Sequence, residues 1–470
     1  MRKTLFAAAS AAALMALAAP ALAQNISVQN NQFNAGAVGS RLNVSGATVG
    51  SVLDGRSTAI GNLYQLSAPT GQGIAEVASN NGGTNSPQAN AGAITANANV
   101  SGVAGGALIA VQSTAAGNAI NSEGVIVSNS GNRVLGQNNS GAVAANLTAY
   151  SVSAGNLTLG STAIGNSFSA DASSAVSLGL GQSNGGAFTQ TNSGAVSADV
   201  AISYNVGATS TERVNGTAVG NAASFDAPSV GVAMTQGNSG AQTATVNFND
   251  GGVSRGSLAV GATAIGNTIQ PTGGTFSTFG AGLVQSNTAG QASLLNVNGG
   301  AAFNGSTADF ASTAVGNAIS VNQTGAVNLN GSQTNSGVGQ SAVLNINAFQ
   351  GGGVGSSGAL SGSATAVGNL VSIDTNGSFG SGLSQSNNAP VYANLNGGSI
   401  IAGTSANLSS LAAGNILQVT GLQSIEGING AANQSNFGSI SSLTNITSGS
   451  FANLTAGATS VGNMTSVSIR

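Results

Sequence analysis

Thr58-Ala59-Ile60-Gly61-Asn62 is the first of nine copies of a short motif that always ends in Gly-Asn. The asparagines that end the copies are Asn62, Asn118, Asn166, Asn221, Asn267, Asn317, Asn369, Asn415 and Asn463. They span 401 residues in eight intervals, which is about 50 residues per interval. A fixed period of this length indicates one structural unit stacked on itself. It argues for a rod or a fibre and against a globular enzyme.

A second motif, Gln-x-Asn, alternates with the first and also occurs nine times. Its glutamines are Gln32, Gln88, Gln137, Gln190, Gln236, Gln285, Gln333, Gln385 and Gln434. Its asparagines are Asn34, Asn90, Asn139, Asn192, Asn238, Asn287, Asn335, Asn387 and Asn436. A glycine usually follows two residues later, which indicates a turn, and a short strand is expected after it, as at 241–248.

Polar and apolar residues alternate after each Gly-Asn motif. Residues two and four positions after the asparagine are mostly apolar, whereas the third is always polar, as at Gln65 and Ser169. This period of two predicts a strand with one buried face. The asparagine shares that face. A carboxamide both donates and accepts hydrogen bonds, so identical side chains on successive coils can form a ladder. We therefore predict structural ladders from the Gly-Asn asparagines and from the glutamines of Gln-x-Asn.

These observations predict an all-β chain that forms a β-solenoid, either curlin-like or similar to a parallel β-helix. Each of the nine units of about 50 residues is expected to make two coils, one on each motif. About eighteen coils at about 4.8 Å each would give a rod of roughly 85 Å. The main rival fold is a nine-bladed propeller. It is disfavoured because blades usually pack with aromatic residues, and this chain is only 4% aromatic.

The first residues resemble an export signal. Arg2 and Lys3 precede an apolar stretch that ends near Ala19, and Ala21-Leu22-Ala23 offers small residues for cleavage. This order predicts a secretory signal peptide at 1–23 and a single repeat domain at 24–470. Without Arg2 and Lys3, six arginines face eleven acids, a net charge of −5. We therefore expect no nucleic-acid partner, since no basic patch is available.

Catalytic and ligand-binding groups are sparse. The chain has no Cys or His, and its charged residues make up 4% of the sequence. We expect no enzyme activity, no metal and no cofactor. Two neighbouring pairs of opposite charge, Asp54 with Arg56 and Glu212 with Arg213, are interpreted as loop ion pairs.

Three residues, Asp199, Asp309 and Arg255, are the alternative candidates for the surface of a β-helix carbohydrate-active enzyme. Acids also recur five residues after the motif asparagine, at Glu123, Asp171, Asp226 and Asp374. Two coils per unit would place them about 9.6 Å apart, where their repulsion is largely screened. They are interpreted as solvated strand ends, or alternatively as a calcium-binding row, although calcium requires six to eight oxygen ligands.

Stretches such as 236–247 and 333–345 carry a Gln-x-Asn-x-Gly…Ala…Asn or closely related spacing that resembles the repeat of curli subunits. The units here are longer and contain a second motif. Together with the signal peptide, the two alternating motifs resemble those of the holdfast anchor proteins of stalked alphaproteobacteria, of the HfaD type. The resemblance implies an amyloid-like protein, secreted through a curli-type outer-membrane pore to the cell surface and associated with the outer membrane. It also implies adhesive polysaccharide or sister surface proteins as partners.

Two functions follow from the sequence. The first is a structural and adhesive surface protein that anchors matrix or associates with itself through exposed end strands. The second is a solenoid that acts on or binds carbohydrate, as a carbohydrate-active enzyme or an adhesin. We expect the first.

Overall fold

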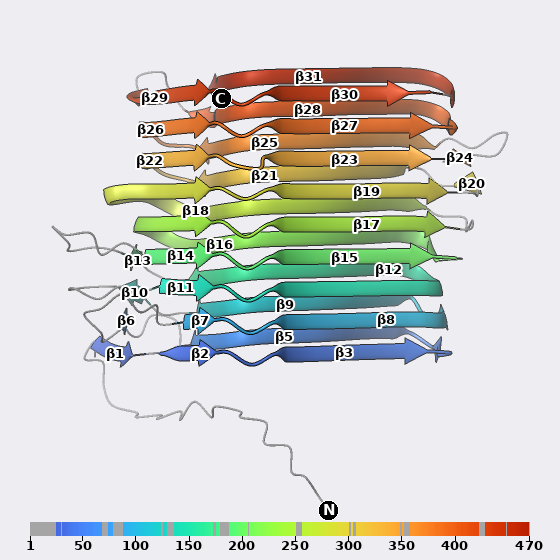
Figure 1. The fold of residues 1–470 in the computed structure, drawn as a ribbon, viewed down its shortest axis with the longest axis horizontal. Coiled ribbons are helices and arrows are strands. Elements are labelled where there is room, and N and C mark those ends of the chain that lie inside the picture. The colour runs from blue at the N-terminus through green and yellow to red at the C-terminus, as the bar shows by residue number, and fades with distance from the viewer. Residues whose placement is uncertain are drawn as a thin grey trace, which may run out of the picture.

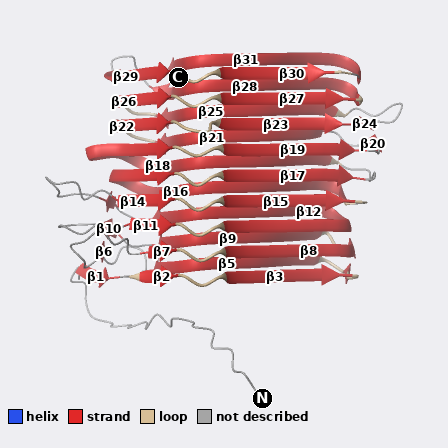
Figure 2. Ribbon diagram, in the orientation of Figure 1, coloured by secondary structure: helices blue, strands red, loops and turns tan. Residues whose placement is uncertain are grey.

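The computed structural model shows a single stack of strands (Figure 1). It describes residues 25–29, 31–67, 74–78, 88–123, 126–128, 136–172, 175–178, 188–204, 206–250, 256–299, 302–303, 307–347, 350–351, 358–422, 428–447 and 449–469. The predicted signal peptide at 1–23 lies outside these ranges. Within them, every helix or strand element is a strand (Figure 2), and all pairings are parallel. The all-β solenoid prediction is confirmed.

Each coil has two layers. In the second unit, the front layer consists of β7 (Gln88–Asn90), which carries Gln-x-Asn, followed by β8 (Ile94–Gly105). The back layer is β9 (Leu108–Glu123), which carries Gly-Asn and returns behind the front layer (Figure 1). A turn at 106–107 joins β8 to β9, with Gly105 and Gly106 both at positive φ.

The same arrangement recurs along the stack. The other Gln-x-Asn strands are β2 (Gln32–Asn34), β11 (Gly136–Asn139), β14 (Phe188–Asn192), β22 (Val327–Asn335), β26 (Phe379–Asn387) and β29 (Ile428–Asn436). The other long front strands are β3 (Val38–Ser45), β15 (Val196–Ser203), β17 (Gln242–Asp250), β19 (Gln291–Gly299), β23 (Gln340–Asn347), β27 (Val391–Gly398) and β30 (Ile440–Ile446). The other back strands are β5 (Val52–Ser67), β21 (Thr307–Gln323), β25 (Ala359–Thr375), β28 (Ile400–Leu422) and β31 (Gly449–Ile469).

Three strands run through more than one of these segments. β12 (Val143–Asp171) joins a front segment to a back segment, and β16 (Gly207–Asn238) and β18 (Ser257–Asn287) each join a back segment to the next Gln-x-Asn segment. The remaining strands are short: β1 (Asn25–Gln29), β4 (Thr48–Val49), β6 (Ile74–Ala78), β10 (Ile126–Ser128), β13 (Ala175–Leu178), β20 (Ala302–Phe303) and β24 (Gln350–Gly351).

The register shows that each unit makes one coil, so the prediction of two coils per unit is wrong. Asn34 pairs with Asn90 and Asn62 pairs with Asn118, one unit later in both cases. Two coils per unit would have stacked the Gly-Asn segment on the Gln-x-Asn segment. Instead, each half unit of about 25 residues spans only one layer of a wide, flattened coil. Nine coils at about 4.8 Å give a stack of roughly 43 Å, half the predicted length.

The interior contains two apolar columns with a polar column between them. One column lies between the long front strands and the first half of the back strands, and Ile94, Leu147 and Phe310 belong to it. The other lies beside the Gln-x-Asn strands and contains Phe168 and Phe225. Side chains of both motifs fill the space between these columns. The part of the chain that the structure describes has no helix long and apolar enough to cross a membrane.

Candidate functional site: the side-chain ladders and the two ends of the stack

The nine asparagines of the Gly-Asn motif form one continuous ladder. Each Nδ2 donates to Oδ1 of the next asparagine at 2.7–2.8 Å, from Asn62 through to Asn463. From Asn118 to Asn415 the side chains are fully buried. A buried amide must find partners for its donors and acceptors. The ladder supplies one donor and one acceptor contact at every internal rung.

The Gln-x-Asn motif forms two further ladders. Its asparagines donate toward the C-terminal end of the stack at 2.6–2.9 Å. Its glutamines donate in the opposite direction, each to Oε1 of the glutamine one unit earlier, at 2.7–2.9 Å. All eighteen residues predicted as ladder positions therefore lie in two of the three rows. The asparagines of Gln-x-Asn form the third.

The second N–H of the Gln-x-Asn glutamines and of the Gly-Asn asparagines joins the two layers, whereas the Gln-x-Asn asparagines mostly donate theirs to a backbone oxygen two residues later, as Asn90 does to Gly92. Gln137 donates through Nε2 to the backbone oxygen of Ser167 at 2.8 Å, and Asn118 donates through Nδ2 to that of Asn138 at 2.9 Å. Equivalent bonds recur in the neighbouring coils, for example from Gln285 to Ala318. The motifs thus hold front to back as well as coil to coil.

A second row of glutamines was not predicted from the sequence. Gln242, Gln291 and Gln340 are buried, and each donates to Oε1 of its predecessor at 2.8 Å where one exists. Each also exchanges two hydrogen bonds with the Gln-x-Asn asparagine of its own coil, as Gln291 does with Asn287. The available signal was a polar residue at a position that is Val or Ile in the other units, such as Val196 in register with Gln242.

At both ends of the stack, ladder atoms have no ladder partner among the described residues. At the N-terminal end, no described residue donates to Oδ1 of Asn34 or Asn62, and Gln32 uses only one N–H, toward Leu63. This end therefore presents two acceptors and one donor. The direction in which each ladder donates determines whether its last side chain has a donor or an acceptor without a ladder partner.

The C-terminal end presents the converse set. Among the described residues, Asn436 has one N–H left after its bond to Gly438, and Asn463 donates only across a long contact of 3.5 Å to the backbone oxygen of Gln434. Oε1 of Gln434 accepts only from the Thr465 hydroxyl among the described residues. Two donors and one acceptor at this end therefore match two acceptors and one donor at the other end.

The apolar columns are open at the same ends. Leu454 is 44% exposed, whereas Leu360, two coils earlier in the same column, is 2% exposed. Val467 is 47% exposed and its neighbour Val419 is 1% exposed. At the first coil, Leu42 is only partly buried, although its register partner Ala98 is fully buried.

The two charge pairs predicted as loop ion pairs behave differently. Asp54 and Arg56 form an exposed ion pair at 3.0 Å, and this contact raises the pKa of Arg56. They lie on strand β5 and not on a loop. Glu212 is fully buried, in register with Leu157 and Leu258, while Arg213 faces solvent. The loop interpretation of Glu212 and Arg213 is therefore wrong, because consecutive strand residues point to opposite faces.

The two candidate enzyme residues that the structure describes lie on different layers. Asp199 lies on the front strand β15 and Asp309 on the back strand β21, while Arg255 lies outside the described residues. Burial raises the pKa of Asp199, and a hydrogen bond from Thr245 opposes that shift.

The acids that follow the Gly-Asn motif lie closer together than expected. Asp171 is in register with both Glu123 and Asp226, so these exposed carboxylates are one coil apart, about 4.8 Å, and the expected 9.6 Å is wrong. Among the described residues, no group of three or more His, Cys, Asp or Glu side chains is arranged to hold a metal ion.

Comparisons with known proteins do not assign the chain to a family. No family model, no curated protein and no solved structure matches it.

Proposed function

We propose that this chain is a non-enzymatic structural protein that assembles end to end into an amyloid-like fibre at the cell surface. In this proposal it is secreted and associated with the outer membrane, and its fibres anchor or build adhesive matrix. The single observation that carries the proposal is the complementarity of the two ends. Among the described residues, Oδ1 of Asn34 and Asn62 have no ladder donor at one end, and Nδ2 of Asn436 and Asn463 have no ladder acceptor at the other.

Only one relative orientation of two copies satisfies these atoms. When the C-terminal end of one copy meets the N-terminal end of the next, Asn436 can donate to Asn34, Asn463 to Asn62, and Gln32 to Gln434. Two N-terminal ends would instead oppose acceptor to acceptor. A head-to-tail contact does not close on itself by a two-fold axis, so it generates an open filament.

The open cross-section adds a driving force. Joining two ends covers Leu454 and Val467, whose exposure contrasts with that of their buried neighbours, and it pairs the free strand edges. Charge does not oppose the contact, because the described residues of the last coil contain no Asp, Glu, Lys or Arg. The separation of Asp199 from Asp309 further favours a structural role over the carbohydrate-active enzyme.

The test compares the wild-type protein with the double variant Leu454→Glu, Val467→Glu. Both substitutions lie at exposed positions of the last coil, so a single stack should still fold. We expect wild-type protein diluted from denaturant to form lengthening fibres by electron microscopy, and the variant to remain as single stacks. Fibres of equal length and number from the variant would overturn end-to-end assembly.

The adhesive part of the proposal is tested in cells. Deletion of the gene should reduce attachment to a surface, and the end-blocked variant should fail to restore it. Unchanged attachment after deletion would overturn the adhesive role even if the protein forms fibres. Release of sugar fragments by the purified protein, lost on changing a single acid, would instead support the enzyme.

A further inference from the structure

The front face carries two outward rows of asparagines that take no part in the buried ladders. The inner row contains Asn247, Asn296, Asn345 and Asn396, bonded in sequence at 2.8–2.9 Å. The outer row contains Asn249, Asn298 and Asn347, bonded at 2.7 Å and 3.2 Å. We call these two rows the asparagine track. It crosses strands β17, β19, β23 and β27 on one face of the stack.

The track presents a regular array of amide groups to solvent. Asn249, Asn298 and Asn347 are all exposed. The ladder bond uses one N–H and one acceptor site of each internal amide, and a carboxamide has two of each. The remaining donors and acceptors recur about every 4.8 Å along the axis, and the two rows lie about 7 Å apart on each strand.

The four strand segments that form the track are uncharged, and the carboxylate of Asp199 lies at their N-terminal edge, in register with Thr245. Residues 243–249, 292–298, 341–347 and 392–398 contain no Asp, Glu, Lys or Arg. A ligand that matched the track would therefore be neutral and rich in hydrogen-bonding groups. Such a ligand would also need to be extended, because the array repeats from coil to coil along the axis.

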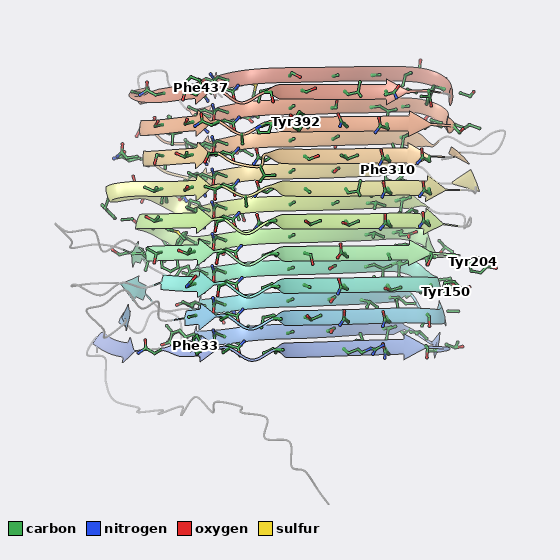
Figure 3. All side chains as sticks on the ribbon, in the orientation of Figure 1. Phe33, Tyr150, Tyr204, Phe310, Tyr392 and Phe437 are labelled. Atoms are coloured by element: carbon green, nitrogen blue, oxygen red, sulfur yellow. The ribbon has the colours of Figure 1, made fainter. Side chains whose placement is uncertain are left out.

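Exposed tyrosines adjoin the track. Tyr150 and Tyr204 are 49% and 57% exposed, and their rings stack with centroids 5.5 Å apart (Figure 3). Tyr150 is in register with Ser203, and Ser203 with Asn249, so the pair continues the outer row toward the N-terminal end. The backbone N–H of Tyr204 also donates to the backbone oxygen of Asn249 at 3.2 Å. An exposed aromatic ring offers a flat apolar surface beside a polar hydroxyl.

We propose that the asparagine track and the Tyr150–Tyr204 pair bind a neutral polysaccharide chain that lies along the stack axis. Amides would pair with sugar hydroxyls, and the tyrosine rings would pack against the C–H faces of sugar rings. The proposal rests on the adhesive role proposed above and gives it a surface and a ligand class. A second stack packed on this face is less suitable, because Tyr392, 41% exposed on the same layer, projects from it along with the tyrosine pair (Figure 3).

The experiment measures binding of the purified wild-type protein to three hexasaccharides by calorimetry. Two are neutral, built of β-1,4-linked glucose or β-1,4-linked N-acetylglucosamine, and the third is the polyanion of galacturonic acid. We expect at least one neutral hexasaccharide to bind more tightly than the polyanion. Failure of both neutral chains to bind, or preference for the polyanion, would overturn the inference.

Matched variants place the ligand on the front face. Asn298→Ala with Asn347→Ala, and separately Tyr150→Ala with Tyr204→Ala, should each weaken binding at least tenfold. The control pair Asn121→Ala with Asn407→Ala removes exposed asparagines of the back layer and should leave binding unchanged. Equal binding by the track variants and the control would contradict the inference.

Assembly is followed on the same samples by electron microscopy. Track variants that form normal fibres but lose the hexasaccharide support the inference. Wild-type protein that binds the neutral chain without forming fibres would also support it, while overturning end-to-end assembly. Fibres that bind no neutral chain would overturn this inference alone.

Discussion

A Cβ atom on Gly316 would lie 2.7 Å from Oδ1 of Asn335 and 2.5 Å from the backbone oxygen of Gly368. Gly316 precedes the asparagine of a Gly-Asn motif, and Asn335 ends the Gln-x-Asn motif of the next unit. The two motifs therefore touch across the layers, at a place with no room for a side chain. The same close contact recurs at the first eight motif glycines and explains why glycine precedes those asparagines, whereas a Cβ on Gly462, in the last coil, would meet only Asn436 Nδ2 at 3.8 Å.

Substitution of Gly316 by alanine should destabilise the stack by about 2–3 kcal/mol, because both the adjacent amide and a backbone strand must move. Gly457→Ala is the matched control, since a Cβ there meets nothing within 4 Å. Urea unfolding of both variants measures the difference. Similar midpoints for the two would show that the close approach is not structurally important.

Removal of one internal ladder amide should cost more than removal of an exposed one. Asn317→Ala deprives Asn267 of its acceptor, and leaves Asn369 and the backbone of Thr334 without their donor. Buried groups that lose their partners cost about 1–3 kcal/mol each, so we expect a loss of roughly 3 kcal/mol or more. The exposed control Asn407→Ala should cost less than about 0.5 kcal/mol. Equal losses in chemical denaturation would contradict a buried ladder.

Asp199 should make stability depend on pH in a defined direction. Burial raises its folded-state pKa above the ordinary value of 3.8, so the folded state binds the proton more tightly than the unfolded state. The stabilisation that Asp199 adds to the free energy of unfolding is therefore present below about pH 4. It is lost as the pH rises through the raised folded-state pKa. Asp199→Asn should increase the free energy of unfolding at pH 7 and have little effect at pH 3. Calorimetric unfolding at both pH values checks this, and an equal gain at both would exclude the charge as its cause.

End-blocked protein should cap growing fibres at one end only. The Leu454→Glu, Val467→Glu variant keeps a normal N-terminal end, so it can join a fibre and then block further addition. We expect a mixture with one variant molecule in twenty to form fibres several-fold shorter than those of wild-type protein alone. Fibres of unchanged length would contradict polar head-to-tail growth, whereas variant protein with charged residues placed at both ends should neither cap nor join.

The repeat period and the strand alternation predicted much of the fold. Each motif recurs once per unit, so any stack that preserves the period places identical amides on one another, and the rows from Asn62 to Asn463 and from Gln32 to Gln434 follow. The alternation of polar residues such as Gln65 with apolar neighbours predicted which face of the strand is buried. These features are local or periodic, and the sequence carries both directly.

The number of coils per unit could not be predicted in the same way. A period of about 50 residues fits two short coils or one wide coil equally well, because both preserve the repeat. The choice depends on whether Asn34 faces Asn62 or Asn90, which is a long-range pairing. The row of Gln242, Gln291 and Gln340 was missed for a different reason. It occurs in only three units, where it replaces Val or Ile in the apolar pattern.

Electron cryomicroscopy of wild-type fibres tests the central claim most directly, because it measures both the coil spacing and the length of one subunit. The structure predicts coils about 4.8 Å apart and one chain every nine coils, or roughly 43 Å, with the three amide ladders continuous across each junction. Single stacks that never lengthen, or fibres in which one chain occupies roughly 86 Å of the axis, would contradict it.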